Sequence, residues 1–111
     1  MIMTGLGIDI VDLTREEFNT PNFATRYMTK YEYEVYMKCN SEHEQKNYMA
    51  CIWSLKEAII KATNHEVIFS DIEIKLTSEA PVCNITTHKI FLSFSFEKKI
   101  ATGIAIAYKN I

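Results

Sequence analysis

Three residues of this sequence have the chemistry to hold a phosphorylated ligand: Asp9, Glu57 and Lys61. Proteins bind magnesium through one or two carboxylates, together with phosphate oxygens and water, and Asp9 and Glu57 would supply two carboxylates. Lys61 could reach a phosphate as a point charge. Together the three residues predict a magnesium site that accepts a pyrophosphate or a nucleotide derivative.

Each of these residues also has a simpler interpretation. Asp9 could end an edge strand at the surface. Glu57 and Lys61 are four residues apart and share a helix face, so they could form an exposed ion pair worth only about 0.3–0.5 kcal/mol. Trp53 and Ile60 flank Glu57, which favours a helix face that is at least partly covered. Taken one at a time, these signals leave both interpretations open.

The element that carries Asp9 is a predicted strand over residues 2–11, in which apolar side chains alternate with smaller or polar ones. One face would carry Ile2, Leu6, Ile8 and Ile10. The other face would place Gly5 and Gly7 beside Asp9. Because glycine has no side chain, this arrangement would leave room for a large ligand to approach the backbone.

The element that carries Glu57 and Lys61 is a predicted helix over residues 46–63. Its apolar residues recur at helical spacing and form one stripe: Tyr48, Ile52, Leu55, Ile59 and Ala62. Asn64 is a plausible stop.

Upstream, we expect a capping box at Thr14 that opens a short helix, a helical turn over 23–28, a second helix from Thr29 to about Lys38, and a loop over 40–45.

Short strands are expected after the long helix, over 71–76, 82–85, 90–96 and 101–108, with 97–100 as a hairpin connection. The order strand, helices, strands predicts an α+β fold with a small, mainly antiparallel sheet packed with helices. The 111 residues are enough for one domain, which would span 1–111.

Composition narrows the choice of partners. A formal net charge of −2 gives no basic excess for nucleic acid, and no apolar run approaches the ~18 residues needed to span a membrane. The three cysteines have no metal-ligand spacing, which indicates reduced thiols in a cytoplasmic protein. The histidines are scattered and are expected at the surface.

The sequence also resembles a known family. Residues 5–12, Gly-Leu-Gly-Ile-Asp-Ile-Val-Asp, resemble the opening motif of the holo-acyl-carrier-protein synthases, the short members of the 4′-phosphopantetheinyl transferase superfamily. Residues 53–62, Trp-Ser-Leu-Lys-Glu-Ala-Ile-Ile-Lys-Ala, resemble the second motif, (W/F)-x-x-K-E-A-x-x-K-A. Segment 23–29 with Glu32, and segments 70–74, 93–96 and 101–107, resemble the rest of the family in order.

The resemblance implies a magnesium-dependent enzyme that moves the 4′-phosphopantetheine group of coenzyme A onto a serine of apo acyl carrier protein and releases adenosine 3′,5′-bisphosphate. It implies a homotrimer with active sites at subunit junctions. By position it makes Asp9 and Glu57 the metal ligands and makes Lys61 catalytic and close to the phosphates. It places Lys56 in the coenzyme A region, and Arg15 and Arg26 in contact with the carrier protein.

The sequence departs from the family at three places. Ile52 replaces an arginine, Thr63-Asn-His-Glu replaces a Gly-Thr-Gly loop, and Phe96 replaces a histidine. A catalytically degenerate relative that binds coenzyme A or carrier protein is therefore the alternative function.

Assembly has a weak signal of its own. A small-residue face on the last strand (Ala101, Gly103, Ala105, Ala107) would permit close approach of another subunit, or of the protein's own helix.

Overall fold

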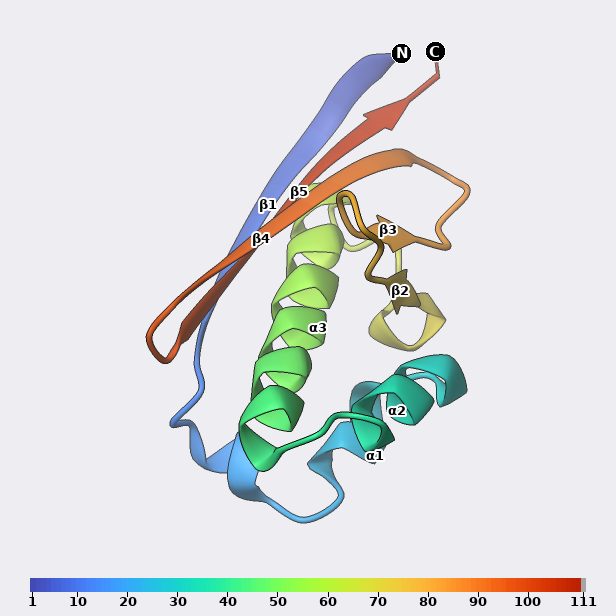
Figure 1. The fold of residues 1–111 in the computed structure, drawn as a ribbon. Coiled ribbons are helices and arrows are strands. Elements are labelled where there is room, and N and C mark those ends of the chain that lie inside the picture. Colours follow the sequence, from blue (N-terminus) through green and yellow to red (C-terminus); the bar gives the residue numbers. More distant parts are fainter. Residues whose placement is uncertain (111) are drawn as a thin grey trace.

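The computed structural model describes residues 1–110. Its main sheet has three antiparallel strands. The strands lie in the order β1 (Ile2–Asp12), β5 (Ile100–Lys109), β4 (Lys89–Glu97). The long helix α3 (Glu42–Ala62) packs along one face of this sheet (Figure 1). The predicted α+β class is thereby confirmed.

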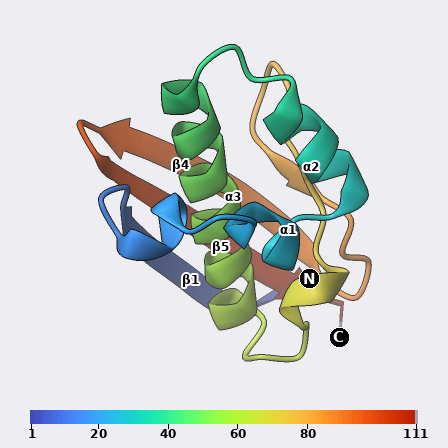
Figure 2. The ribbon, with the colours of Figure 1, turned by 90° about the horizontal axis from the view of Figure 1, so that it is seen from below.

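A third layer covers the side of α3 that faces away from the sheet (Figures 1 and 2). It contains the helices α1 (Phe23–Tyr27) and α2 (Lys30–Met37) and a two-stranded sheet of β2 (Ile74–Lys75) and β3 (Val82–Cys83). β2 and β3 are shorter than the predicted strands. Two 3-10 helices complete the elements, Glu16–Asn19 (η1) and Phe69–Asp71 (η2).

Glycines on β1 and β5 determine how closely α3 approaches the sheet. A Cβ atom on Gly7 would lie 1.9 Å from the carbonyl oxygen of Ala58, and one on Gly5 would lie 1.9 Å from that of Ala62. The space beside Asp9 is therefore filled by the backbone of α3, and the expectation that these glycines leave room for a ligand was wrong.

The stripe predicted for α3 is confirmed, since all five of its residues are buried. The helix begins at Glu42, earlier than predicted, because the Ser41 hydroxyl accepts a hydrogen bond from the Glu44 amide at 3.1 Å and caps the first turn. It ends at Ala62, and Asn64 follows with a left-handed φ of 53°. The backbone amide of His65 then closes the helix end by donating to Ile60 O at 2.9 Å.

The cap expected at Thr29 is present as a full capping box, whereas the capping box expected at Thr14 is absent. At α2 the Thr29 hydroxyl accepts from the Glu32 amide, and the Glu32 carboxylate accepts from the Thr29 amide. Thr14 instead donates its hydroxyl to Asp12 at 2.6 Å, so the segment that follows forms only the short 3-10 helix η1, without a side-chain cap.

The two faces of the sheet differ in what covers them. Ala101, Ala105 and Ala107 are fully buried under α3, so of the two uses left open for the small-residue face of β5, the structure shows packing against the protein's own helix. The opposite face is apolar and uncovered, with side chains 37–62% exposed: Met3, Leu6, Ile8, Ile10, Phe91 and Ile104. No helix within residues 1–110 has the length and apolar character to cross a membrane.

Candidate active site

The packing of β1 against α3 brings Asp9, Glu57 and Lys61 together. Asp9 lies in the middle of β1, opposite Gly103 of β5, where the helix passes over the strand. The Lys61 ammonium donates to the backbone carbonyl of Ile8 at 2.9 Å and lies 3.4 Å from Asp9 Oδ1. Residues that are 52 positions apart in the sequence thus share one small charged site.

The Asp9 carboxylate is mostly enclosed and incompletely bonded. Its side chain is 16% exposed, and its Oδ2 atom is buried without a hydrogen-bond partner among residues 1–110. Buried polar atoms are nearly always hydrogen-bonded, so an exception needs a physical explanation. A cation bound at this oxygen would supply the missing interaction.

The electrostatics of Glu57 point to the same conclusion. Burial raises its pKa, and so does the negative charge of Asp9, while Lys61, His65 and Arg15 act in the opposite direction. Two carboxylates that repel each other in a partly buried site are stabilised by a hard divalent cation. Within the part of the chain that the structure describes, no group of three or more His, Cys, Asp or Glu side chains could hold a metal ion. Two carboxylates, completed by phosphate oxygens and water, nevertheless suit magnesium.

Lys56 lies elsewhere, although it is adjacent to Glu57 in the sequence. Its side chain is fully buried, with Nζ 2.6 Å from Glu32 Oε1 and 2.7 Å from the carbonyl oxygen of Tyr27. Burial lowers its pKa, and the bond to Glu32 partly opposes that effect. Its ammonium is thus engaged within the protein core, so its predicted contact with coenzyme A remains a prediction.

Arg15 and Arg26 are both exposed. Arg15 donates to the backbone carbonyl of Ile10 at 3.3 Å, which places it beside β1 and within the electrostatic range of Glu57. Arg26 lies in the last turn of α1. Of the two arginines, Arg15 is the one whose charge lowers the pKa of Glu57. The role of both residues in docking remains a prediction.

The positions that depart from the family occupy different surroundings. Ile52 is fully buried. Phe96 lies on β4, which β5 separates from β1 within one chain, and its ring packs edge-on against Phe94. Asn64 and His65 both adopt left-handed φ angles, 53° and 64°, a conformation that glycine adopts most easily.

His65 is a residue of this site that sequence reasoning missed. It was expected only at the surface, and it is exposed, but its charge also influences Glu57. The sequence did contain a signal for this position, namely Asn64, the predicted helix stop. A chain that reverses direction at Asn64 brings the next residue, His65, back toward the end of α3. The expectation that the histidines lie at the surface was wrong for His88, which is buried and lies beside Thr87 and Glu66.

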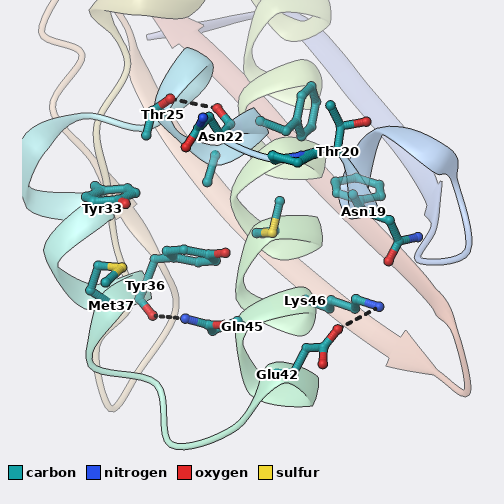
Figure 3. A pocket seen from close by; sticks show the side chains of 15 residues that line it. Asn19, Thr20, Asn22, Thr25, Tyr33, Tyr36, Met37, Glu42, Gln45 and Lys46 are labelled. Carbon is teal, nitrogen blue, oxygen red and sulfur yellow. Dashed lines mark hydrogen bonds and ion pairs between the residues drawn. The ribbon is translucent and has the colours of Figure 1, made fainter.

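A cavity of about 480 Å³ lies apart from the carboxylate pair, between the segment around α1, α2 and the first turns of α3 (Figure 3). The charged groups at its wall pair with each other, with Lys46 Nζ 3.5 Å from Glu42 Oε1. Gln45 donates its side-chain amide to the carbonyl oxygen of Tyr36 at 3.3 Å. None of the predicted site residues lines this cavity, so it belongs to a different part of the molecule.

Comparison with known proteins agrees with this fold. Residues 5–109 match the family model described as the 4′-phosphopantetheinyl transferase superfamily. A holo-(acyl-carrier-protein) synthase of Mycoplasma pneumoniae is 38% identical over 98% of this chain and 97% of its own length. The corresponding synthase of Ureaplasma parvum is 42% identical over 94% of this chain and 93% of its own length.

A solved structure shows the same architecture. The holo-(acyl-carrier-protein) synthase of Bacillus anthracis, described as a complex with CoA (3′,5′-ADP), has a TM-score of 0.88 and 28% identity, covering 99% of this chain and all of the other. The chain therefore belongs to the 4′-phosphopantetheinyl transferase superfamily. Its enzyme class within that superfamily is that of the holo-acyl-carrier-protein synthases.

Proposed function

We propose that this chain, as a single domain over residues 1–111, transfers the 4′-phosphopantetheine group of coenzyme A to a serine of apo acyl carrier protein. Adenosine 3′,5′-bisphosphate would be the second product, and the reaction would require magnesium. The observation that supports this proposal best is the buried, unpartnered Oδ2 of Asp9, together with a second carboxyl, Glu57, whose pKa is raised by burial and by the charge of Asp9.

The chemistry divides between the two proteins. The serine oxygen of the carrier protein would form a bond to the phosphorus that bears pantetheine, and the bond from that phosphorus to the oxygen of the leaving bisphosphate would break. Magnesium at Asp9 and Glu57 would neutralise charge on the pyrophosphate. Lys61, whose side chain is 49% exposed, would stabilise the negative charge on the transferring group. The nucleophile belongs to the partner, so this chain needs none of its own.

Docking of the carrier protein is assigned to the surface around Arg15 and Arg26. Carrier proteins of this kind are acidic, and a basic residue beside the active site would raise the association rate. Arg15 suits that role because its bond to Ile10 O holds it next to the strand that carries Asp9.

A homotrimer is part of the proposal. The uncovered apolar face of the sheet, centred on Leu6, Ile8 and Ile10 of β1, is a large hydrophobic surface for a chain of this size. Other subunits would cover it. This face supports assembly better than the small-residue face of β5, which α3 already covers.

Release of adenosine 3′,5′-bisphosphate tests the function. The protein is incubated with coenzyme A and magnesium, with and without apo carrier protein, and the nucleotide is quantified by chromatography. Release that needs both the carrier protein and magnesium supports the proposal. Tight binding of coenzyme A without release would favour the degenerate relative, to which the left-handed, non-glycine Asn64 and His65 give some support.

A further inference from the structure

A fully buried ion pair connects the helix of the active site to the third layer of the fold. Lys56 Nζ lies 2.6 Å from Glu32 Oε1, and both side chains are 0% exposed. The Glu32 carboxylate also accepts from the amides of Thr29, at 2.9 Å, and Ile74, at 2.6 Å. Glu32 therefore fixes the start of α2 and strand β2, and Lys56 holds this carboxylate on α3.

The second bond of Lys56 is the one that reaches α1. Its ammonium donates to the carbonyl oxygen of Tyr27, the last residue of that helix, at 2.7 Å. α1 has only five residues and no side-chain cap at its N-terminus, so it has little stability of its own. The Tyr27 hydroxyl donates to the carbonyl oxygen of Met49 at 3.0 Å, a second attachment of the same residue to α3.

An aromatic cluster connects this attachment to the active site. The Tyr27 ring meets Trp53 edge-on, with 5.2 Å between centroids, and Phe23 and Phe69 lie within 5.5 Å of Trp53. Trp53 precedes Glu57 by one helical turn and therefore shares its side of α3. A change in the position of Tyr27 would be transmitted to the surface beside Glu57.

We propose that Lys56 is a positioning residue for carrier-protein docking and makes no contact with coenzyme A. Through Tyr27 it seats α1 against α3, and it thereby holds in place the aromatic cluster around Trp53 and the exposed Arg26 in the last turn of α1. The identity of the docking partner rests on the proposed function. The role of Lys56 within the fold rests only on the contacts given above.

Two variants distinguish a role of Lys56 in positioning α1 from a role in the stability of the fold. Lys56→Met keeps most of the stem and removes the ammonium, but it leaves Glu32 buried without its partner. The double variant Glu32→Gln/Lys56→Met removes both charges, and the carboxamide introduced on α2 can still accept a bond from the Ile74 amide. Both variants lack the bond to Tyr27 O. Lys30→Met, at an exposed lysine of α2, is the control.

Trp53 gives a readout that needs no substrate, because it is the only tryptophan in the chain. We expect the single variant to unfold at lower denaturant concentration and the double variant to regain part of that loss. Both should show shifted Trp53 emission, and both should raise the KM for carrier protein by roughly threefold, the size of effect expected when an exposed charged contact such as that of Arg26 is weakened. The KM for coenzyme A should stay as in the wild type.

Three results would overturn the proposal. If the double variant kept the Trp53 emission and the carrier-protein KM of the wild type, the Lys56–Glu32 pair would have only a structural role. A raised KM for coenzyme A with unchanged emission would make Lys56 a contact residue. Failure of both variants to fold would make Lys56 a requirement of the whole fold. If the wild type transfers nothing, the proposed function fails, whereas shifted emission in both variants would still support the seating of α1.

Discussion

Lys61 and Asp9 meet where α3 crosses β1, but their ion pair is loose. Lys61 Nζ lies 3.4 Å from Asp9 Oδ1, whereas its bond to the carbonyl oxygen of Ile8 is 2.9 Å long. The second oxygen of Asp9 has no partner in the described chain. The ammonium is thus anchored by backbone, and the carboxylate keeps an oxygen available for a cation.

The first prediction concerns the two carboxylates. Asp9→Asn and Glu57→Gln should each reduce kcat/KM for transfer by roughly 100-fold or more, because each removes charge at the proposed metal position. The free energy of unfolding of the metal-free protein should not fall, since one of two repelling charges is lost. Urea unfolding beside the activity assay checks both parts, with Glu34→Gln on α2 as the exposed control. Near-normal transfer in either site variant would contradict the assignment.

The second prediction is a pH dependence. The pKa of Glu57 is raised above 4.5 in the folded protein, so the folded chain holds this proton more tightly than the unfolded chain. As pH rises from 4.5 through the raised pKa, the free energy of unfolding of the metal-free protein should therefore fall. Glu57→Gln should reduce that fall, and magnesium should oppose it by favouring the ionised pair. Identical pH profiles for wild type and variant would refute this account of Glu57.

Elements with a strong periodic pattern could be predicted from the sequence. β1, α3 and the hairpin of β4 and β5 were expected within a few residues, because alternation and helical spacing reflect burial on one face. The helix cap at Thr29 was expected for a similar reason, since a cap joins residues only three positions apart. Local chemistry determined these features.

Features that depend on contacts across the fold were not predicted. Lys56 is charged, and only the approach of Glu32 and the Tyr27 carbonyl explains its burial. Gly5 and Gly7 were correctly seen as close-approach positions, but the sequence could not show that α3 rather than a ligand occupies the space. Thr14 was missed for a different, local reason. Its hydroxyl donates to Asp12 instead of capping a helix, and residue spacing alone does not decide between these two local hydrogen bonds.

The third prediction tests the close packing of strand and helix. In Gly7→Ala the new Cβ would meet the carbonyl oxygen of Ala58 at 1.9 Å, and a backbone atom cannot move aside as a side chain can. We expect a loss of about 1–3 kcal/mol in the free energy of unfolding, or more, and lower activity as α3 shifts away from Asp9. Ser93→Ala, at an exposed position of β4, should change neither. A Gly7→Ala protein as stable as the wild type would mean that β1 and α3 are farther apart than described.

The fourth prediction tests the apolar face of the sheet. Leu6 is 62% exposed at its centre, so Leu6→Glu should leave the subunit folded and convert the proposed trimer to monomers by placing a charge in the interface. Light scattering measures the mass, and circular dichroism checks the fold. Glu34→Lys on α2 changes charge far from this face and should remain trimeric. A wild type that is monomeric at micromolar concentration would remove the basis for the trimer.

The fifth prediction concerns Arg15. Arg15→Glu should raise the KM for carrier protein far more than the KM for coenzyme A, and should flatten the salt dependence of the reaction, because exposed charges act mainly on association. Lys30→Glu provides the same charge reversal at another exposed position. Equal effects of the two variants would show that only net charge matters, and no effect of Arg15→Glu would exclude Arg15 from the docking surface.

The most direct test of the central claim is the mass of the carrier protein itself. Apo carrier protein is incubated with coenzyme A, magnesium and either the wild type or Glu57→Gln, and the intact protein is then weighed by mass spectrometry. The account predicts a gain equal to one phosphopantetheine group, located on a serine, with the wild type, and almost none with the variant or with a chelator. An unchanged mass with folded wild-type protein would contradict the proposed transfer, and an equal gain with Glu57→Gln would contradict the proposed site.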